Sequence, residues 1–459
     1  MNASILLAST VLVASLSASS LSAPMTPECE WIFAGGGEKS DKARGVAFDR
    51  NGNAFIAAET TGDSTLGPLS HRSAGGMDCV LIKLDTEGRP LWLRSIGGSA
   101  IDRAYAVACD ALGNAYVTGH FESTDATADN IKLPNLGSYD LFVAKYSPEG
   151  RLLWIRTGGG PGYDYGHAIA VDGKGNIVVS GSLAAGGKIA DKASVPEGAP
   201  SAVFCAKYDP EGNVLWAKTT TEGLAGSGHG IAVDAENNVF VGGSLSGSGN
   251  LFGLKAAPEK TSAFVCKLDP SGNGLWSHLS KGNPSAVYHE INCDRSGKVW
   301  AVGMFKGSVA IGETVFSSSS DKDNDGLIVS LDEAGKVRWT KNVSGPSTDY
   351  CLGVAVDEKG TAFVSGDFHG ETTLAGKRMS SLGSGDIFIA AFDPIGNLEW
   401  LQQAGGAGND SAYPIVFQAP DQLLIGGSIT APATLGKREL KQSAGTDLYG
   451  AKWRIRTAK

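Results

Sequence analysis

Residues 202–216 read AVFCAKYDPEGNVLW, and this stretch decides the fold. An apolar strand leads into a tight turn, and a second strand then ends on a tryptophan. In the turn, Asp209 accepts a backbone hydrogen bond, Pro210 presets its own φ, and Gly212 takes the left-handed conformation that closes a type I turn with a bulge. The stretch therefore predicts a β-hairpin.

The same hairpin returns along the whole chain. When Trp300 and Trp453 are set aside, the tryptophans fall 60 to 63 residues apart, at Trp31, Trp92, Trp154, Trp216, Trp276, Trp339 and Trp400. A fixed period of this length is the signature of a repeat architecture. Each unit begins with two further strands joined by a similar turn, as in YGHAIAVD at 165–172 followed by IVVSG at 177–181. We therefore expect four antiparallel strands in each unit.

The first strand of each unit alternates large and small residues. Ile169 and Val171 are large and apolar, whereas Ala168 and Ala170 between them are small. Both faces of such a strand can be buried, one by bulk and the other by close approach of a neighbour. This is what the innermost strand of a propeller blade requires, because neighbouring blades pack face to face around an axis.

Composition agrees with a repeat array and limits the partners. The chain has 459 residues, including 63 Gly and 18 Pro, which suits many short strands and tight turns. A net charge of −9, without any cluster of Lys or Arg, argues against a nucleic-acid partner. The seven cysteines show no CxxC spacing, and most lie in apolar strands, so we expect them to be buried packing residues.

The pattern VxxDxxGNxYVxG followed by DxFVAKYxPEGxLLW resembles the seven-bladed beta-propeller (SBBP) repeat family of bacterial exported proteins. The resemblance extends from Cys29 to Trp453. A second likeness is carried by DPEGNVLW at 209–216, which is similar to the Asp-x-x-Gly-x-x-x-Trp motif of pyrroloquinoline-quinone-type propeller repeats. Those repeats are shorter, so the first family is the better match.

These observations predict an all-β, seven-bladed β-propeller of four-stranded antiparallel blades, in a single domain at 24–459. The seven blades are expected at about 41–98, 102–160, 164–222, 226–282, 286–346, 349–406 and 410–456. The last unit lacks a fourth strand, and the strand at 29–37 has no unit of its own. We expect this N-terminal strand to pair with DLYGAKW at 447–453 and to close the ring, which would remove the exposed edges of a linear array.

The N-terminal residues 1–23 combine an apolar run with small residues and are typical of a secretory signal peptide. No Lys or Arg precedes the apolar run. We expect a secreted, periplasmic or cell-surface protein, because no later segment of the sequence is long and apolar enough to span a bilayer.

Three histidines occupy one repeat position in successive units. His167, His229 and His289 each stand five residues before the turn aspartate. The other units carry Arg44, Tyr105, Leu352 and Tyr413 at that position. We expect these side chains to ring one mouth of the channel, where the histidines could bind a metal, hold an anion when protonated, or form hydrogen bonds between blades. The last role is favoured.

The fifth unit adds two polar residues to the same strand. Glu290 and Asn292 replace residues that are Gly, Ala, Pro or Val elsewhere. A buried carboxylate without a partner is costly, so these groups should either reach a ligand in the channel or pair with a neighbouring blade.

An acidic loop, DKDNDG at 321–326, matches the calcium-loop pattern D-x-D-x-D-G. Its candidate ligands are Asp321, Asp323 and Asp325. The last of these is also the copy of an aspartate that opens the third strand in other units, namely Asp78, Asp140, Asp386 and Asp447. A solvated acidic loop is therefore the favoured alternative to a calcium site.

Another aspartate recurs where the first strand begins. It is present as Asp41, Asp102, Asp164, Asp349 and Asp410, and is replaced by Gly226 and Ala286 in the two remaining units. Its recurrence predicts a structural role, in which the carboxylate caps loop backbone.

Function is less clearly encoded than fold. The chain has no P-loop, HExxH or GxSxG motif. The segments between second and third strands vary among units, and variable loops on a rigid scaffold commonly serve recognition. We expect a monomeric, non-catalytic binding protein that recognises a protein or a glycan through the loops of one face. The alternative is an enzyme with a metal-dependent or quinone-dependent site at the channel mouth.

Overall fold

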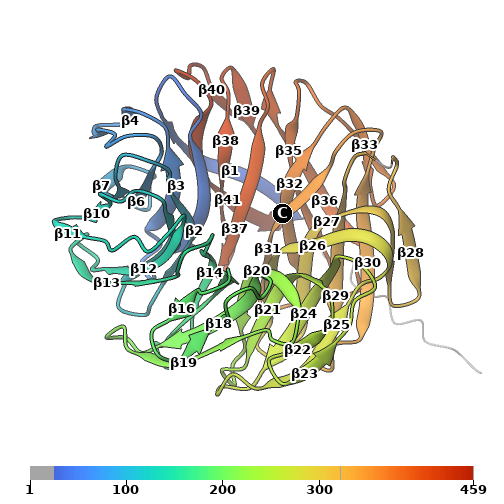
Figure 1. Ribbon diagram of the computed structural model, residues 1–459. Coiled ribbons are helices and arrows are strands. Elements are labelled where there is room, and N and C mark those ends of the chain that lie inside the picture. Colours follow the sequence, from blue (N-terminus) through green and yellow to red (C-terminus); the bar gives the residue numbers. More distant parts are fainter. Residues whose placement is uncertain (1–24, 321, 458–459) are drawn as a thin grey trace, which may run out of the picture.

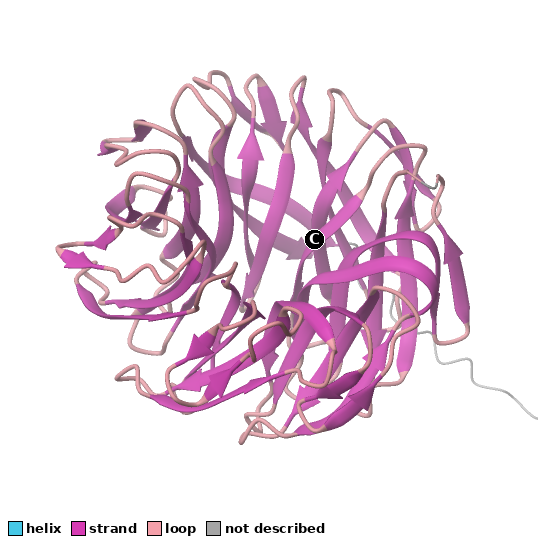
Figure 2. Cartoon of the chain, viewed as in Figure 1, coloured by secondary structure: helices cyan, strands magenta, loops and turns pink. Residues whose placement is uncertain are grey.

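The computed structural model describes residues 25–320 and 322–457, so the predicted signal peptide at 1–23 lies outside the described residues. Within these ranges every regular element is a strand, which confirms the all-β prediction (Figure 2). No helix in the described part of the chain is long and apolar enough to cross a membrane. The sheets are arranged around a central opening in a propeller-like manner (Figure 1).

Each repeat unit forms a meander of antiparallel strands in which the first strand pairs with the second, the second with the third, and the third with the fourth. The first strands are β2 (Lys42–Phe48), β8 (Asp102–Cys109), β14 (Tyr165–Val171), β20 (Ala225–Val233), β26 (Lys281–Cys293), β31 (Tyr350–Val356) and β37 (Ser411–Gln418). The second strands are β3 (Ala54–Thr60), β9 (Ala115–Phe121), β15 (Ile177–Leu183), β21 (Val239–Ser246), β27 (Val299–Ile311), β32 (Ala362–Phe368) and β38 (Gln422–Ile429).

The outer half of each unit is built in the same way. The third strands are β6 (Asp78–Leu84), β12 (Asp140–Tyr146), β18 (Ala202–Tyr208), β24 (Ser262–Leu268), β29 (Asp325–Leu331), β35 (Asp386–Phe392) and β41 (Asp447–Thr457). The fourth strands are β7 (Pro90–Gly97), β13 (Leu152–Gly158), β19 (Val214–Thr219), β25 (Gly274–Leu279), β30 (Val337–Ser344), β36 (Leu398–Gly406) and, for the last unit, β1 (Met25–Gly35).

The variable segments between second and third strands also contain short strands. These are β4 (Ser64–Leu66), β5 (Leu69–His71), β10 (Thr127–Ala128), β11 (Ile131–Lys132), β16 (Lys188–Ile189), β17 (Ala193–Ser194), β22 (Gly249–Leu251), β23 (Leu254–Ala256), β28 (Thr314–Ser317), β33 (Glu371–Leu374), β34 (Lys377–Ser380), β39 (Ala433–Leu435) and β40 (Arg438–Leu440). Several of them reach back to the preceding unit: β10 pairs with β7, β33 with β30, and β39 with β36. The segments expected to serve recognition therefore also join neighbouring sheets.

The two ends of the described chain lie in one sheet. Strand β1 pairs with β41 in antiparallel register from Met25↔Thr457 to Gly35↔Leu448, and β41 in turn pairs with β38. Trp31 and Phe33 of β1 are buried against the first unit. Consecutive first strands contact one another, and β37 contacts β2 in the same way.

The repeated tryptophans act between units. In six of the seven repeated tryptophans the indole Nε1 donates a hydrogen bond to a backbone carbonyl in the second turn of the next unit. The six bonds run from Trp31 to Thr86 (3.0 Å), Trp92 to Pro148 (3.0 Å), Trp154 to Pro210 (3.0 Å), Trp216 to Pro270 (3.1 Å), Trp276 to Glu333 (3.0 Å) and Trp339 to Pro394 (3.2 Å). The turn glycine, such as Gly212 at φ +83°, lies directly against the indole face, where a Cβ would clash.

Trp400 is the exception. Its buried Nε1 has no hydrogen-bond partner among the described residues. The unit that should supply the carbonyl is the last one, whose third strand is β41 and whose fourth strand is β1. These two strands come from opposite ends of the chain, so no turn connects them, and the missing bond follows from the divided unit.

The aspartates that precede the first strands cap backbone, as predicted. Asp41 accepts hydrogen bonds from the backbone N–H groups of Gly37 and Thr61, both at 2.7 Å. Asp410 repeats this with Gly406 and Thr430, also at 2.7 Å. The capped loops join the end of one sheet to the start of the next.

The indole bond can be tested with a pair of matched variants. We expect Trp154→Phe to lower the free energy of unfolding by about 1 kcal/mol more than Trp400→Phe, because only the first change removes a hydrogen bond. Both side chains are 9% exposed, so the loss of buried area is similar. Urea unfolding followed by fluorescence measures the difference. Equal losses would contradict a stabilising role for the bond.

The terminal pairing generates a second prediction. Deletion of residues 1–35 removes β1 and leaves the whole edge of β41 unpaired, so we expect the melting temperature to fall by more than 10 °C or the cooperative transition to vanish. Deletion of residues 1–24 keeps β1 and serves as the control. Equal melting temperatures for the two truncated proteins would show that β1 does not hold the fold together.

Candidate ligand-binding channel

Every first strand carries a bulge at the same place. The register of pairing with the second strand skips one residue between Gly166 and Ala168, and likewise between Gly228 and Gly230. The skipped position is the one five residues before the turn aspartate. A bulge re-aims the side chain of the extra residue away from the normal alternation. The bulged residues are Arg44, Tyr105, His167, His229, His289, Leu352 and, together with Pro414, Tyr413.

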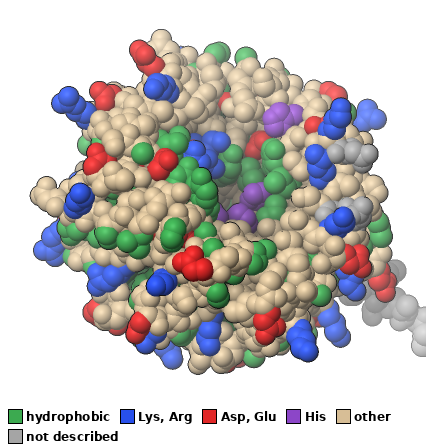
Figure 3. All heavy atoms as spheres, viewed as in Figure 1, with side chains coloured by type: hydrophobic (Ala, Val, Ile, Leu, Met, Phe, Trp, Pro, Cys, Tyr) green, Lys and Arg blue, Asp and Glu red, His purple; other side chains and the backbone are tan. Residues whose placement is uncertain are grey.

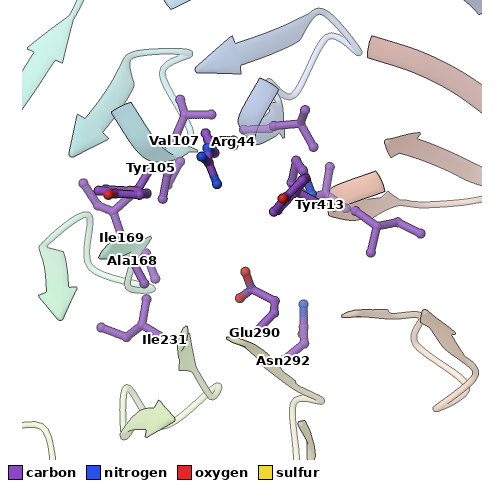
Figure 4. Close-up of a pocket in the computed structure, with 18 of the residues that line it drawn as sticks. Arg44, Tyr105, Val107, Ala168, Ile169, Ile231, Glu290, Asn292 and Tyr413 are labelled. Atoms are coloured by element: carbon purple, nitrogen blue, oxygen red, sulfur yellow. The ribbon is translucent and has the colours of Figure 1, made fainter. Parts of the chain in front are cut away.

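All seven first strands line one central cavity of about 620 Å³, and every bulged residue faces it. Figure 3 shows the hollow, with histidine side chains visible inside it. Val107, Ile169 and Ile231 form part of its apolar wall, and Arg44 and Tyr413 lie across the cavity from Glu290 (Figure 4). The volume lies in the range of cavities that hold small ligands.

The structure brings the three predicted histidines together as a contiguous series of rings, in which His167 and His229 are stacked at an interplanar angle of 27° and His289 is tilted by 58° against His229. The ring centroids of His167 and His229 are 4.7 Å apart, and those of His229 and His289 are 5.6 Å apart. Tyr105 extends the series, with its ring 4.9 Å from that of His167. His167 Nδ1 also lies 3.2 Å from the carbonyl oxygen of Gly228 on the next first strand. The favoured interblade role is consistent with these contacts.

Sequence reasoning missed a second layer of rings behind the stack. His120 stacks on Tyr139 with centroids 4.5 Å apart, and Tyr165 stacks on His167 at 5.1 Å. Tyr163 continues the layer to the surface, where 56% of it is exposed. The one sequence signal was the alternation of Tyr163, Tyr165 and His167, which places their rings near the same edge of the sheet.

The histidines are neutral at neutral pH. Burial lowers the pKa of His167 and of His289 to about 4. Burial, reinforced by the two neighbouring imidazoles, holds the pKa of His229 well below its usual range. A stack of neutral rings does not attract an anion by charge, so anion binding would require acid conditions.

Among the described residues, no group of three or more His, Cys, Asp or Glu side chains is arranged to hold a metal ion. His167 and His229 present ring faces to one another, whereas a metal must be approached by nitrogen lone pairs in the ring planes. In the acidic loop, Asp323 accepts a hydrogen bond from Ser320 Oγ at 2.6 Å and Asp325 accepts one from Ser319 Oγ at 3.2 Å. Asp321 lies outside the described residues.

Glu290 and Asn292 differ in what they contact. Asn292 Nδ2 donates to the carbonyl of Val354 on the next first strand, at 3.4 Å. Glu290 points into the cavity (Figure 4), and its carboxylate accepts only the N–H of Ile291, at 3.3 Å. Burial raises the pKa of Glu290 to about 8. In the described part of the chain it has no ion-pair partner.

The basic group of the cavity, in contrast, is already paired. Arg44 lies 2.8 Å from Glu59, which also approaches Arg103 at 3.4 Å. The Arg44 guanidinium further lies over the ring of Tyr413, 5.1 Å from its centroid. The cavity therefore contains one neutralised cation and one carboxyl group without a counter-charge.

The repeated four-stranded units are arranged around a central opening in a propeller-like manner (Figure 1), and the comparisons with known proteins agree with this arrangement. Residues 34–64 match the family model of SBBP, the beta-propeller repeat, which confirms the resemblance to that repeat family. The chain is also 22% identical over 372 residues to an uncharacterised WD repeat-containing protein, L264, of Acanthamoeba polyphaga mimivirus. That match covers 66% of this chain and 27% of the viral protein, so the chain spans about a quarter of its relative.

Solved structures with a similar fold share little sequence. A hydrazine synthase of Kuenenia stuttgartiensis is 9% identical at a TM-score of 0.47, covering 83% of this chain and 92% of that one. YCF48 bound to D1 peptide is 10% identical at a TM-score of 0.43, and the match covers 95% of this chain and 97% of that one. A PQQ-bound aldose sugar dehydrogenase of Streptomyces coelicolor is 11% identical at a TM-score of 0.36, and the match covers 95% of this chain and 99% of that one. At these values the likeness carries no information about what this chain binds.

The lowered pKa values predict a pH dependence. Because the folded protein holds these imidazoles neutral, they bind fewer protons than in the unfolded chain below pH 6.5, and their contribution to stability falls as the pH drops toward 4. The variant His229→Phe keeps an aromatic ring at this position. Between pH 7.5 and pH 4.5 we expect its free energy of unfolding to fall by about 1 kcal/mol less than that of the wild type. Urea unfolding at pH 7.5 and pH 4.5 measures the difference. If acid lowered the free energy of unfolding of the wild type and of His229→Phe equally, His229 would not be neutral in the folded protein.

Proposed function

We propose that the protein is an exported, non-catalytic binding protein whose seven four-stranded sheets are the blades of one closed propeller. Three contacts support closure: β1 pairs with β41, β37 contacts β2, and Gly36 bridges to Thr65 of the first unit. The same kind of bridge joins Gly159 to Lys188 between two internal units. The two ends of the chain thus meet as neighbouring units do.

We infer that the ligand enters the cavity from the face that carries the variable segments. In an antiparallel meander the start of the first strand and the end of the second strand lie side by side, at the same end of the sheet. The bulged residues near the starts of the first strands and the segments that follow the second strands therefore belong to one face. Ligands commonly meet propellers and other rigid scaffolds at such loop-rich faces.

The observation that carries the proposal is the unpaired carboxyl group of Glu290 in the cavity. A ligand bearing a primary ammonium group would supply the missing counter-charge, with the aromatic rings of Tyr105 and Tyr413 as apolar walls. Flat faces of sugar rings pack well on aromatic side chains, and a cavity of about 620 Å³ accommodates two or three sugar residues. A glycan that contains amino sugars fits this chemistry.

Calorimetric titration with glucosamine trimer and its fully N-acetylated counterpart tests the proposal. We expect the amino form to bind and the acetylated form to bind at least about tenfold more weakly, a difference of about 1.4 kcal/mol. Glu290→Gln should remove the preference. Because the ammonium lowers the raised pKa of Glu290, binding should release about one proton near pH 7, which titrations in two buffers measure.

Glu197→Gln is the control, since this exposed glutamate lies in a variable segment outside the cavity. Binding of trilysine without binding of the glucosamine trimer would move the assignment to a peptide ligand. A stoichiometric metal or a quinone absorbance band in the purified protein would move it to the enzymatic alternative. Absence of binding for all three probes would overturn the proposed ligand class.

A further inference from the structure

Aspartates meet in pairs at five of the junctions between neighbouring sheets. One member precedes the first strand of a unit, and the other opens the third strand of the unit before it. The pairs are Asp41 with Asp447, Asp102 with Asp78, Asp164 with Asp140, Asp349 with Asp325, and Asp410 with Asp386. All ten side chains are buried, with exposures between 0% and 5%.

The two carboxylates of a pair converge on one small space. A Cβ built on Gly159 would lie within 3.0 Å of both Asp140 Oδ1 and Asp164 Oδ2. A Cβ built on Gly405 would lie equally close to one oxygen each of Asp386 and Asp410. Any side chain at these glycines would therefore displace the carboxylates, and Gly159 also has a φ of +142°.

At the junction of Asp140 and Asp164, both converging oxygens lack a hydrogen-bond partner among the described residues, whereas Asp41 Oδ2, Asp102 Oδ2 and Asp410 Oδ2 each accept a backbone N–H. Asp164 Oδ1 accepts the N–H of Ala184 at 2.7 Å, and Asp140 Oδ2 accepts the N–H of Leu136. The facing atoms, Asp164 Oδ2 and Asp140 Oδ1, have no hydrogen bond from any described residue. Unpaired oxygens of the same kind are found at Asp78, Asp325, Asp386 and Asp447. Two buried, ionised carboxylates in such contact would repel each other strongly.

The members of a pair occur together or not at all. At the two remaining junctions, Ala202 and Ser262 replace the third-strand aspartate, and Gly226 and Ala286 replace the other one. The residue five after the repeat tryptophan follows the same division. It is Gly36, Gly97, Gly159, Gly405 or Ser344 where a pair is present, and Thr221 or Lys281 where it is absent. The two aspartates and the small residue therefore occur together at the same five junctions.

We propose that the Asp140–Asp164 pair is a binding site for one proton, which is shared between the facing carboxylate oxygens of the two neighbouring sheets. The protonated carboxyl donates its O–H to the ionised one, so a short hydrogen bond replaces the repulsion. The pair then carries one negative charge instead of two, and it joins the sheets at the junction.

The surroundings favour a proton over an ion pair, most clearly at Asp140 and Asp164. Burial raises the pKa of Asp164 to about 6, and the only other charged group that acts on it is Asp140. The remaining pairs have further titratable neighbours. Asp41 lies near Glu59 and His71, and Asp78 lies near His71 and Cys79. Asp349 lies near Asp323, His369 and Cys351, and the pair of Asp386 and Asp410 lies near His369 and Tyr449.

The shared proton links stability to pH with a definite sign. The folded pair keeps its proton up to about pH 6, whereas aspartates of the unfolded chain release theirs near pH 4. The contribution of the pair is therefore fully present in acid and is lost as the pH rises through this interval. This sign is opposite to that of the histidine stack.

Asp140→Asn tests the proposal, because the amide supplies permanently the hydrogen that the proton supplies in the wild type. We expect the wild-type folding equilibrium constant to decrease at least tenfold more than that of Asp140→Asn between pH 4.5 and pH 7.5. Infrared difference spectra should show a carbonyl band of protonated carboxyl groups at pH 5.5 that is weaker in the variant. Asp209→Asn, which changes a turn aspartate of lowered pKa, should not reproduce either effect.

Two results would overturn the proposal. Parallel pH profiles of wild type and Asp140→Asn, together with an unchanged carbonyl band, would show that the pair holds no proton. Stoichiometric calcium or another cation in the dialysed protein, lost in the double variant Asp140→Asn with Asp164→Asn, would show that a metal neutralises the pair. The infrared readout remains interpretable if the variant is less stable, since it needs only folded protein.

Discussion

The structure depends on the contact that six of the seven repeated tryptophans make with the turn of the next sheet. A sheet in such an array packs only against its two neighbours, so its stability depends on these junctions. The indole of Trp154 donates to the carbonyl of Pro210, and its face packs against Gly212. The turn needs glycine both for its positive φ and for the close approach of the ring. The turn motif and the tryptophan are thus two halves of one contact.

A second constraint is the bulge in every first strand. Because the backbone irregularity itself aims one side chain at the channel, the residue type at that position is free to differ between units. Arg44, Tyr105, His167 and Leu352 all occupy it without any change in strand pairing. A scaffold fixed by the tryptophan contacts can therefore carry many different channel linings. In this chain six of the seven bulged positions carry a charged, polar or aromatic side chain, and the seventh carries Leu352.

Repeat register alone predicted a large part of this arrangement. It identified the all-β fold, the capping role of Asp41 and its copies, the pairing of the N-terminal strand with residues 447–453, and the convergence of the three histidines. Register fixes where a residue lies but not how its ring is rotated, so it could not distinguish a stack from a metal site. The sequence also could not predict which carbonyl groups accept the indole hydrogen bonds, because every residue has a backbone carbonyl whatever its side chain.

The centre of the protein is built to hold little charge at neutral pH. The stacked imidazoles are neutral, Arg44 is paired with Glu59, and the raised pKa of Glu290 favours its protonated form. Seven first strands converge there, and burial among them disfavours the charged forms of the imidazoles and of Glu290. Side chains whose charge can be removed by gain or loss of a proton suit such a site. An incoming ammonium group would ionise Glu290 and form the ion pair that this carboxyl group makes with no described residue.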